Sequence, residues 1–287
     1  MESRMQEVIR PDGSVVTYEV SGSGAPVLLL APSGISSAAT EWGGYFIDPR
    51  ILADDFTVIS MDQRYAGAGR APLEPFSHES VFADQLAVLD ALEFPDAAVI
   101  GADFYCASAL KFACDAPART RATVLVEPMG LDDSNSMDVY YGMFNETIRM
   151  ARAEGLDGVI RAAANNPAFA DNPAAGPWCQ RLCREPGFSA ALRSLGREGY
   201  ITLIVDFRDG AFPWGKRYFS VNELAANGTS VPILMAPGND ELHPPGLAAR
   251  LNENGVNASI CGASRDNPDD LIDEIRQFLR RHTSQTT

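Results

Sequence analysis

Short runs of consecutive apolar residues recur along the chain, separated by polar or glycine-rich turns. They lie at residues 26–31, 56–61, 97–100, 123–126 and 231–236. Runs of this length without alternation are typical of strands that are buried on both faces of a parallel sheet. An alternating run at residues 15–20 predicts an opening strand, and residues 258–261 predict the last strand.

Helical patterns separate these runs. Ser80 can cap a helix in which Phe82, Leu86 and Leu89 fall on one face. Further helices are expected at residues 105–116 and 246–251, and a final one begins at Asn267-Pro268 with Leu271, Ile275, Phe278 and Leu279 facing inward. Because strands and helices alternate, the pattern predicts an α/β fold: a mostly parallel central sheet with helices on both faces.

Residues 130–229 break this alternation and predict an inserted, mainly helical cap. The segment is rich in aromatic residues, among them Tyr140, Tyr141 and Trp214, and its helical stretches are joined by turns rich in proline, glycine and asparagine. The buried-strand pattern resumes only after it. We therefore expect a core of residues 1–129 and 230–287 and a cap of residues 130–229.

Composition narrows the classes of partner. The chain has 287 residues and a formal net charge of −15, so its acidic surface disfavours nucleic acid and anionic membranes. No apolar run approaches the length of a membrane helix, and the amino terminus lacks the apolar region of a signal peptide. The five cysteines show no tight metal spacing. These features predict a cytoplasmic protein with reduced thiols and no membrane association, and they leave a homodimer open.

The sequence gives no indication of a bound metal or organic cofactor. Gly67-Ala68-Gly69 lacks the strand-and-helix setting of a phosphate-binding loop. The three histidines, His78, His243 and His282, form no cluster in the sequence. His78 is expected to cap a helix or lie on the surface, and His282 lies near the chain end. We expect no metal and no cofactor, and a small apolar or aromatic molecule as substrate.

The elements and the loops between them occur in an order that resembles the α/β-hydrolase fold. Four loop motifs carry the resemblance: Pro32-Ser33-Gly34, Asp62-Gln63-Arg64, Gly101-Ala102-Asp103 and Gly238-Asn239-Asp240. They fall where that fold has its oxyanion-hole loop, the loop after the fourth strand, the nucleophile elbow and the acid loop after the seventh strand. The resemblance covers nearly the whole chain outside the cap. It implies that backbone N–H groups near Ser33, Gly34 and Phe104 stabilise negative charge on an oxygen of the substrate.

Asp103 stands where the elbow more commonly has serine. This aspartate resembles the branch of the fold that contains epoxide hydrolases and haloalkane dehalogenases, in which a carboxylate attacks an sp³ carbon and water hydrolyses the resulting ester. Tyr105 replaces the second glycine of the elbow and is expected to crowd the turn. A solvated or capping role for Asp103 stays open. Cys106 is interpreted as a small residue of the following helix.

The base histidine of the family is missing from its usual loop. That loop, residues 262–267, contains no histidine. His243 lies three residues after Asp240, at the carboxyl end of a buried strand, where ligand sites gather in such sheets. It is the candidate replacement, oriented by Asp240 or by Glu127 at the end of the sixth strand. The alternatives are a loop histidine packed between prolines, a structural Asp240 and a Glu127 that only terminates its strand.

Three functions are compatible with these residues. The first is hydrolysis of an epoxide or related electrophile, with Asp103 as nucleophile, His243 as base and Tyr140 or Tyr141 as proton donor. The second is a non-hydrolytic reaction of secondary metabolism (lyase, cyclase or carbon–carbon bond formation) with Asp103 as general acid or base in a dry pocket. The third is a catalytically inactive binding protein. A cap containing Tyr140, Tyr141 and Trp214 suits an apolar or aromatic substrate in either enzyme.

Overall fold

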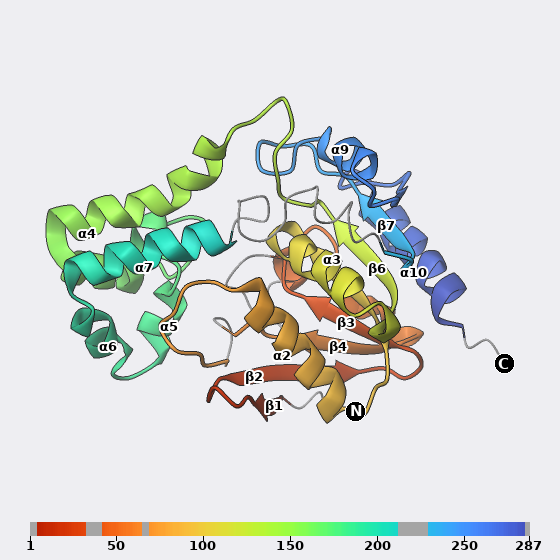
Figure 1. The fold of residues 1–287 in the computed structure, drawn as a ribbon, viewed down its shortest axis with the longest axis horizontal. Coiled ribbons are helices and arrows are strands. Elements are labelled where there is room, and N and C mark those ends of the chain that lie inside the picture. The colour runs from red at the N-terminus through yellow and green to blue at the C-terminus, as the bar shows by residue number, and fades with distance from the viewer. Residues whose placement is uncertain (1–4, 33–41, 65–68, 212–228, 285–287) are drawn as a thin grey trace.

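The computed structural model describes residues 5–32, 42–64, 69–211 and 229–284. These residues form an eight-stranded sheet with the order β1-β2-β4-β3-β5-β6-β7-β8 (Figure 1). Strand β2 runs antiparallel to β1 and to β4, and all other neighbours are parallel. The strands are β1 Gln6–Ile9, β2 Val15–Ser21, β3 Pro26–Leu30, β4 Thr57–Met61, β5 Ala97–Ala102, β6 Thr120–Val126, β7 Ile233–Ala236 and β8 Ser259–Ile260.

The central strands are buried because their side chains are apolar on both faces of the sheet. Every residue of β3, β4 and β5 is buried. Successive side chains enter two separate cores: Leu28 and Val99 pack on one face, and Val27 and Ala98 pack on the other. The predicted mostly parallel α/β architecture is confirmed. Strand β1 escaped prediction because its sequence, QEVI, is short and mostly exposed.

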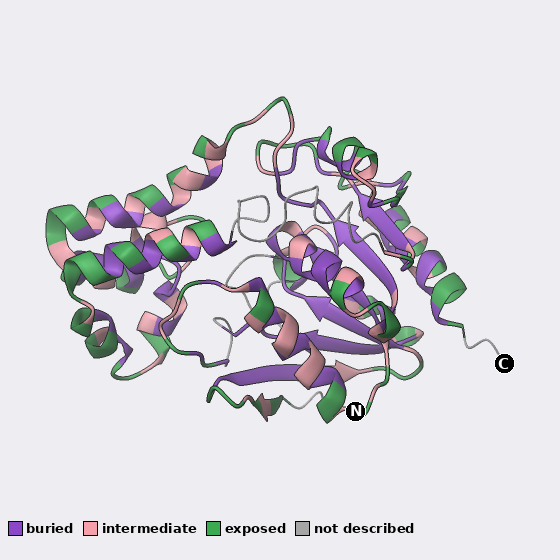
Figure 2. Ribbon diagram, viewed as in Figure 1, coloured by how far each residue is buried: buried purple, intermediate pink, exposed green. Residues whose placement is uncertain are grey.

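Helices cover both faces of this sheet, with their exposed residues turned outward (Figure 2). Residues of α2 (His78–Ala91), α3 (Cys106–Asp115) and α9 (Leu247–Glu253) join the core on one face. Helix α10 (Pro268–Thr283) joins the other core through the four apolar residues that the sequence predicted. Short 3₁₀ helices connect these elements: η1 Trp42–Gly44, η2 Pro49–Asp54, η3 Asp103–Tyr105, η4 Pro117–Arg119 and η5 Pro173–Ala175.

Helix α2 begins earlier than its sequence suggested. Ser77, not Ser80, is the N-cap: its backbone is extended, and its side-chain oxygen accepts a hydrogen bond from the Ser80 backbone N–H at 3.2 Å. The prediction of Ser80 as N-cap was wrong. Ser77 and Ser80 are the same residue type, and the sequence does not show which of them precedes the first turn. The earlier start places His78 on the buried face of the helix.

A helical insertion lies between β6 and β7 and forms a separate layer beside the core (Figure 1). Its helices are α4 Met137–Asn165, α5 Cys179–Arg184, α6 Phe188–Ser194 and α7 Gly196–Ala211. Helix α4 is kinked at Gly155, which has a φ of 67°. A buried hydrogen bond of 2.6 Å between the Thr147 and Tyr200 hydroxyls joins α4 to α7. The insertion is the expected helical cap, while its boundaries at residues 130 and 229 stay a prediction.

Among the residues that the structure describes, no helix is both long and apolar enough to cross a membrane.

Candidate active site

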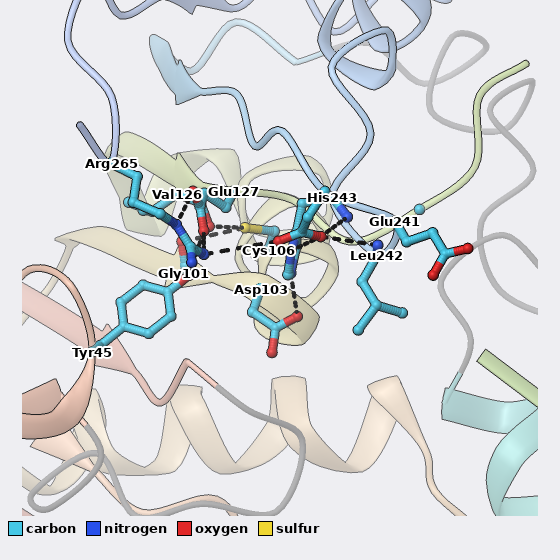
Figure 3. Close-up of polar contacts among 12 residues, drawn as sticks. Tyr45, Gly101, Asp103, Cys106, Val126, Glu127, Glu241, Leu242, His243 and Arg265 are labelled. Carbon is cyan, nitrogen blue, oxygen red and sulfur yellow. Dashed lines mark hydrogen bonds and ion pairs between the residues drawn. The ribbon is translucent and has the colours of Figure 1, made fainter. Parts of the chain in front are cut away.

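Asp103 occupies a sharp turn at the carboxyl end of β5. Its backbone has a φ of 50°, in the left-handed region that side chains other than glycine seldom adopt. The turn depends on Gly101, because a Cβ atom there would lie 2.5 Å from the carbonyl oxygen of Tyr105 and 2.8 Å from the Cβ of Ala109. The strand therefore passes directly into η3 and α3, and the Asp103 side chain projects beyond the sheet (Figure 3).

The tyrosine of the elbow does not prevent this geometry. The side chain of Tyr105 is fully buried, with its ring 5.2 Å from the Phe104 ring and 6.4 Å from the Phe76 ring. Tyr105 thus packs into the core of the sheet face that α2 and α3 cover. The turn accommodates the tyrosine by burying its ring in this core, and Asp103 has the positive φ of a sharp turn.

The loop after β7 holds the second part of the site. Asp240 accepts hydrogen bonds on Oδ1 from the backbone N–H groups of Leu242 and His243, each at 2.9 Å. The same oxygen lies 2.8 Å from Nδ1 of His243. Gly238 makes the tight loop possible, since a Cβ atom there would lie 2.3 Å from the Cβ of His243. The His243 ring is therefore oriented from within its own loop.

His243 connects this loop to the elbow. Its Nε2 atom lies 2.8 Å from Oδ1 of Asp103, so one imidazole ring bridges Asp103 and Asp240 (Figure 3). The two loops come from β5 and β7, which lie on either side of β6 in the sheet. The structure brings together the three residues that the sequence singled out as catalytic. The ring is mostly buried, with 10% of its side chain exposed.

Burial and the two carboxylates control the charge of this group. Burial disfavours the charged imidazolium, but the hydrogen bonds and negative charges of Asp103 and Asp240 outweigh it and raise the pKa of His243 to about 9. Burial raises the pKa of the Asp103 carboxyl, and the His243 contact only partly offsets that effect. For Asp240, the His243 contact and backbone N–H groups overcome burial and lower the pKa. The raised pKa values of His243 and Asp103 both favour keeping a proton between these two side chains.

Glu127 lies beside this group at the end of β6. It too has a positive φ, 49°, and is 2% exposed. Its carboxylate accepts hydrogen bonds from Nε and Nη2 of Arg265 and from the Tyr45 hydroxyl, the last at 3.2 Å. Glu127 makes no hydrogen bond to His243 among the described residues, so of the two predicted orienting residues it is Asp240 that contacts the ring. Arg265 and Tyr45 were not predicted as site residues. Arg265 could have been found from the sequence, because it lies in the loop where the family has its histidine, but nothing in the sequence points to Tyr45.

The two candidate tyrosines of the cap, Tyr140 and Tyr141, lie on α4 and contact Arg208 of α7. The Tyr140 hydroxyl donates to the backbone oxygen of Arg208 at 3.4 Å, and the Arg208 guanidinium lies 4.0 Å from the centre of the Tyr141 ring. Burial raises the pKa of Tyr140, and the charge of Asp103 adds to the effect, so this phenol lies within electrostatic reach of the site. The candidates Ser33, Gly34 and Trp214 lie outside the described residues.

Cys106 and His78, the other potential nucleophile and base, are buried in the core. The buried Cys106 thiol donates to the carbonyl oxygens of Gly101 and Val126, and burial raises its pKa well above the ordinary range. His78 is fully buried, 3.1 Å from the Ser108 hydroxyl, and burial lowers its pKa to about 4. His78 was expected to cap a helix or lie on the surface. This was wrong, because His78 is the first residue of α2 and lies on the buried face of that helix. The described residues contain no cluster able to hold a metal ion.

Solved structures with the same fold cover nearly all of the chain. An esterase from Thermogutta terrifontis is similar over 98% of this chain and 100% of its own, with a TM-score of 0.63 and 18% sequence identity. An enol-lactonase from Burkholderia xenovorans LB400 covers the same shares with a TM-score of 0.59 and 18% identity. A meta-cleavage product hydrolase from Pseudomonas fluorescens IP01 covers 96% of this chain and 97% of its own, with a TM-score of 0.60 and 18% identity.

Sequence comparison agrees with these structures. A 2-hydroxymuconate semialdehyde hydrolase from Pseudomonas sp. (strain CF600) is 29% identical over 152 residues, which cover 53% of this chain and 46% of that relative. The chain thus matches less than half the length of this relative. Residues 26–172, which include the elbow and the first part of the cap, match the alpha/beta hydrolase fold family. The chain belongs to the alpha/beta hydrolase fold family.

Proposed function

We propose that this protein is a hydrolase of a small apolar or aromatic electrophile, an epoxide or a related compound, with Asp103 as nucleophile and His243 as acid and base. The observation that carries the proposal is the single imidazole that bridges the elbow carboxylate and Asp240, with 2.8 Å on each side. The name of the matched relative, a hydrolase, supports the general class of reaction. The carboxylate at the elbow supports attack on an sp³ carbon and an ester intermediate.

In the first step, a carboxylate oxygen of Asp103 attacks an epoxide carbon. The new C–O bond of the ester forms as the epoxide C–O bond breaks, and the released oxygen needs a proton. His243 carries one at neutral pH, since its pKa is raised to about 9. Its Nε2 atom lies beside Asp103, and it can protonate the opened oxygen and become neutral. Tyr140, whose pKa is raised by burial and by the charge of Asp103 among other groups, is the second candidate donor for this proton.

Ester formation also prepares the second step. The ester has no negative charge, so Asp103 no longer raises the pKa of His243, and the neutral ring becomes a base for water. The water oxygen attacks the ester carbon, and the ester C–O bond breaks. The alcohol leaves with the proton balance restored: Asp103 ionised and His243 protonated. The backbone N–H of Phe104 favours the ionised form of Asp103 and would stabilise the oxyanion that forms on it.

A single turnover in water labelled with heavy oxygen tests this sequence. With a molar excess of protein over an aryl epoxide, one label atom is expected in Asp103, detected by mass spectrometry of its peptide. The product should contain none from that turnover. A His243→Gln variant loses the acid of the first step and the base of the second, so the ester should form more slowly than in the wild type and then persist, seen as the substrate mass added to the same peptide. His282→Gln, at an exposed position near the end of α10, is the matched control and should behave like the wild type.

A non-hydrolytic acid–base reaction is the second candidate. The observation that favours it is the raised pKa of the Asp103 carboxyl, because a protonated aspartate donates a proton instead of attacking carbon. In that reaction the product forms without heavy oxygen in either Asp103 or the product. Turnover with that result, and no adduct in His243→Gln, would replace the first proposal by this one.

A further inference from the structure

The loop after β8 sends one side chain back across the ends of three strands. Arg265 donates through Nε to Oε1 of Glu127 at 2.9 Å and through Nη2 to Oε2 of the same carboxylate. The Nη2 atom also lies 4.0 Å from Oδ2 of Asp240. Arg265, Glu127 and Asp240 follow β8, β6 and β7, so the guanidinium links three neighbouring loops at the carboxyl edge of the sheet (Figure 3).

Glu127 fixes the position of this arginine. The Glu127 side chain is 3% exposed, and a buried carboxylate is stable only with partners that satisfy its charge. Arg265 supplies a two-bonded contact of the kind that restricts a guanidinium in orientation as well as in distance. On its outer side, the Arg265 Cζ atom lies 4.9 Å from the centre of the Phe46 ring. The cation is thus held in place, although 52% of its side chain is exposed.

The two oxygens of Asp240 have different surroundings. Oδ1 receives the Leu242 and His243 backbone N–H groups and faces the His243 ring. Oδ2 is the oxygen that faces Arg265. We propose that Arg265 is a positioning residue of this site. Glu127 holds its guanidinium beside Oδ2 of Asp240. There its positive charge weakens the attraction of Asp240 for the protonated His243 ring, so the ring gives up its proton more easily. The relevance of this control to turnover rests on the proposed function.

The expected effect follows from the charges around His243. The ring faces Asp103 from the elbow and Asp240 from its own loop. Beyond Asp240 lie Arg265, and then Glu127 with the Tyr45 hydroxyl. Without the Arg265 charge, Asp240 and Glu127 act on His243 uncompensated, and the ring holds its proton more tightly. Without the Glu127 charge, Arg265 acts alone, and the ring loses its proton more easily.

Titration of the histidine ring signals by NMR tests this without any substrate. The chain has three histidines, and the signal of His243 is the one that disappears in His243→Gln. Arg265→Gln should move the His243 midpoint upward by about 0.5 to 1 pH unit, and Glu127→Gln should move it downward. Arg265→Lys keeps the charge and should stay close to the wild type. Arg280→Gln is the matched control: its arginine is 58% exposed and pairs with Asp55 at the opposite end of the sheet.

Opposite shifts in Arg265→Gln and Glu127→Gln would support the proposal, because a purely structural role would disturb the site in the same direction in both variants. Shifts of the same sign would overturn it, and so would a midpoint in Arg265→Gln equal to that in Arg280→Gln. A folded state is checked for each variant by the dispersed methyl signals of the same spectra. If the shifts occur but Asp103 takes up no heavy oxygen, the nucleophile assignment fails while the role of Arg265 stands.

Discussion

Two groups of charged residues in the described parts of the chain differ in the residue at their centre. In the first, after β4, Arg64 donates to Asp84 at 2.8 and 2.9 Å, to Glu74 at 2.7 Å and to Asp12 at 3.1 Å. In the second, at the carboxyl ends of β5 and β7, His243 lies between Asp103 and Asp240. Both groups place a positive charge among carboxylates.

Only the second group can change its charge at ordinary pH. An arginine keeps its proton at any pH that a protein survives, so the Arg64 group acts as a fixed tie between loops. A histidine can give its proton away and take it back. The backbone shows the same contrast: among the described residues, four that are not glycine have a positive φ, and two of these are Asp103 and Glu127. Strain of this kind is concentrated at functional sites. The comparison separates a fixed positive charge from one that can be lost and regained.

The largest expected difference between the two groups is the effect of one substitution in each on the free energy of unfolding and on turnover. Arg64→Met leaves the buried Asp84 with Arg10 as its remaining cation, and the free energy of unfolding should fall by roughly 3 kcal/mol. Asp103→Asn should change it by less than about 1 kcal/mol, because asparagine tolerates a positive φ and His243 keeps Asp240. Turnover in Asp103→Asn should nevertheless fall about 1,000-fold or more. Urea unfolding and initial rates measure both, and equal losses of stability would contradict the comparison.

A smaller effect is expected at the elbow itself. In Gly101→Ala the added Cβ would meet the Tyr105 carbonyl oxygen at 2.5 Å, so the backbone must shift. We expect a loss of roughly 1 to 3 kcal/mol in the free energy of unfolding, with lower turnover because Asp103 moves relative to His243. Gly142→Ala in α4 is the control, since no atom lies within 4 Å of its added Cβ. A stable, fully active Gly101→Ala would show that the turn does not need this glycine.

The fold could be predicted almost completely from the sequence, and the chemistry only in part. Buried parallel strands are apolar on both faces, so their positions are visible in the sequence, and the base candidate His243 could be placed at a strand end. The Arg265–Glu127 contact could not, because it joins residues 138 positions apart through side-chain rotamers that no local pattern specifies. The prediction of the α2 N-cap failed for a simpler reason: both Ser77 and Ser80 are serines, and either could cap the helix.

The smallest expected effect is a pH dependence of stability. The pKa of His243 is raised in the folded state to about 9, above its unfolded value of about 6.5. Its contribution is therefore fully present below about pH 6.5 and is lost as the pH rises through 9. Across that range, the difference in unfolding free energy between the wild type and His243→Gln should shrink by about 1 to 2 kcal/mol, since solvent screens the half-exposed Asp240. The Arg64 group should show no such change, and a flat difference would contradict a protonated His243.

The three-residue interval between Asp240 and His243 has a consequence for how this site responds to changes in its loops. All of the contacts that orient the ring on its Nδ1 side come from the segment Gly238 to His243, whose loop closes on itself. A change in the length of this one loop would therefore displace Asp240 and His243 together, while a change in the loop after β8 would leave the contact between them in place.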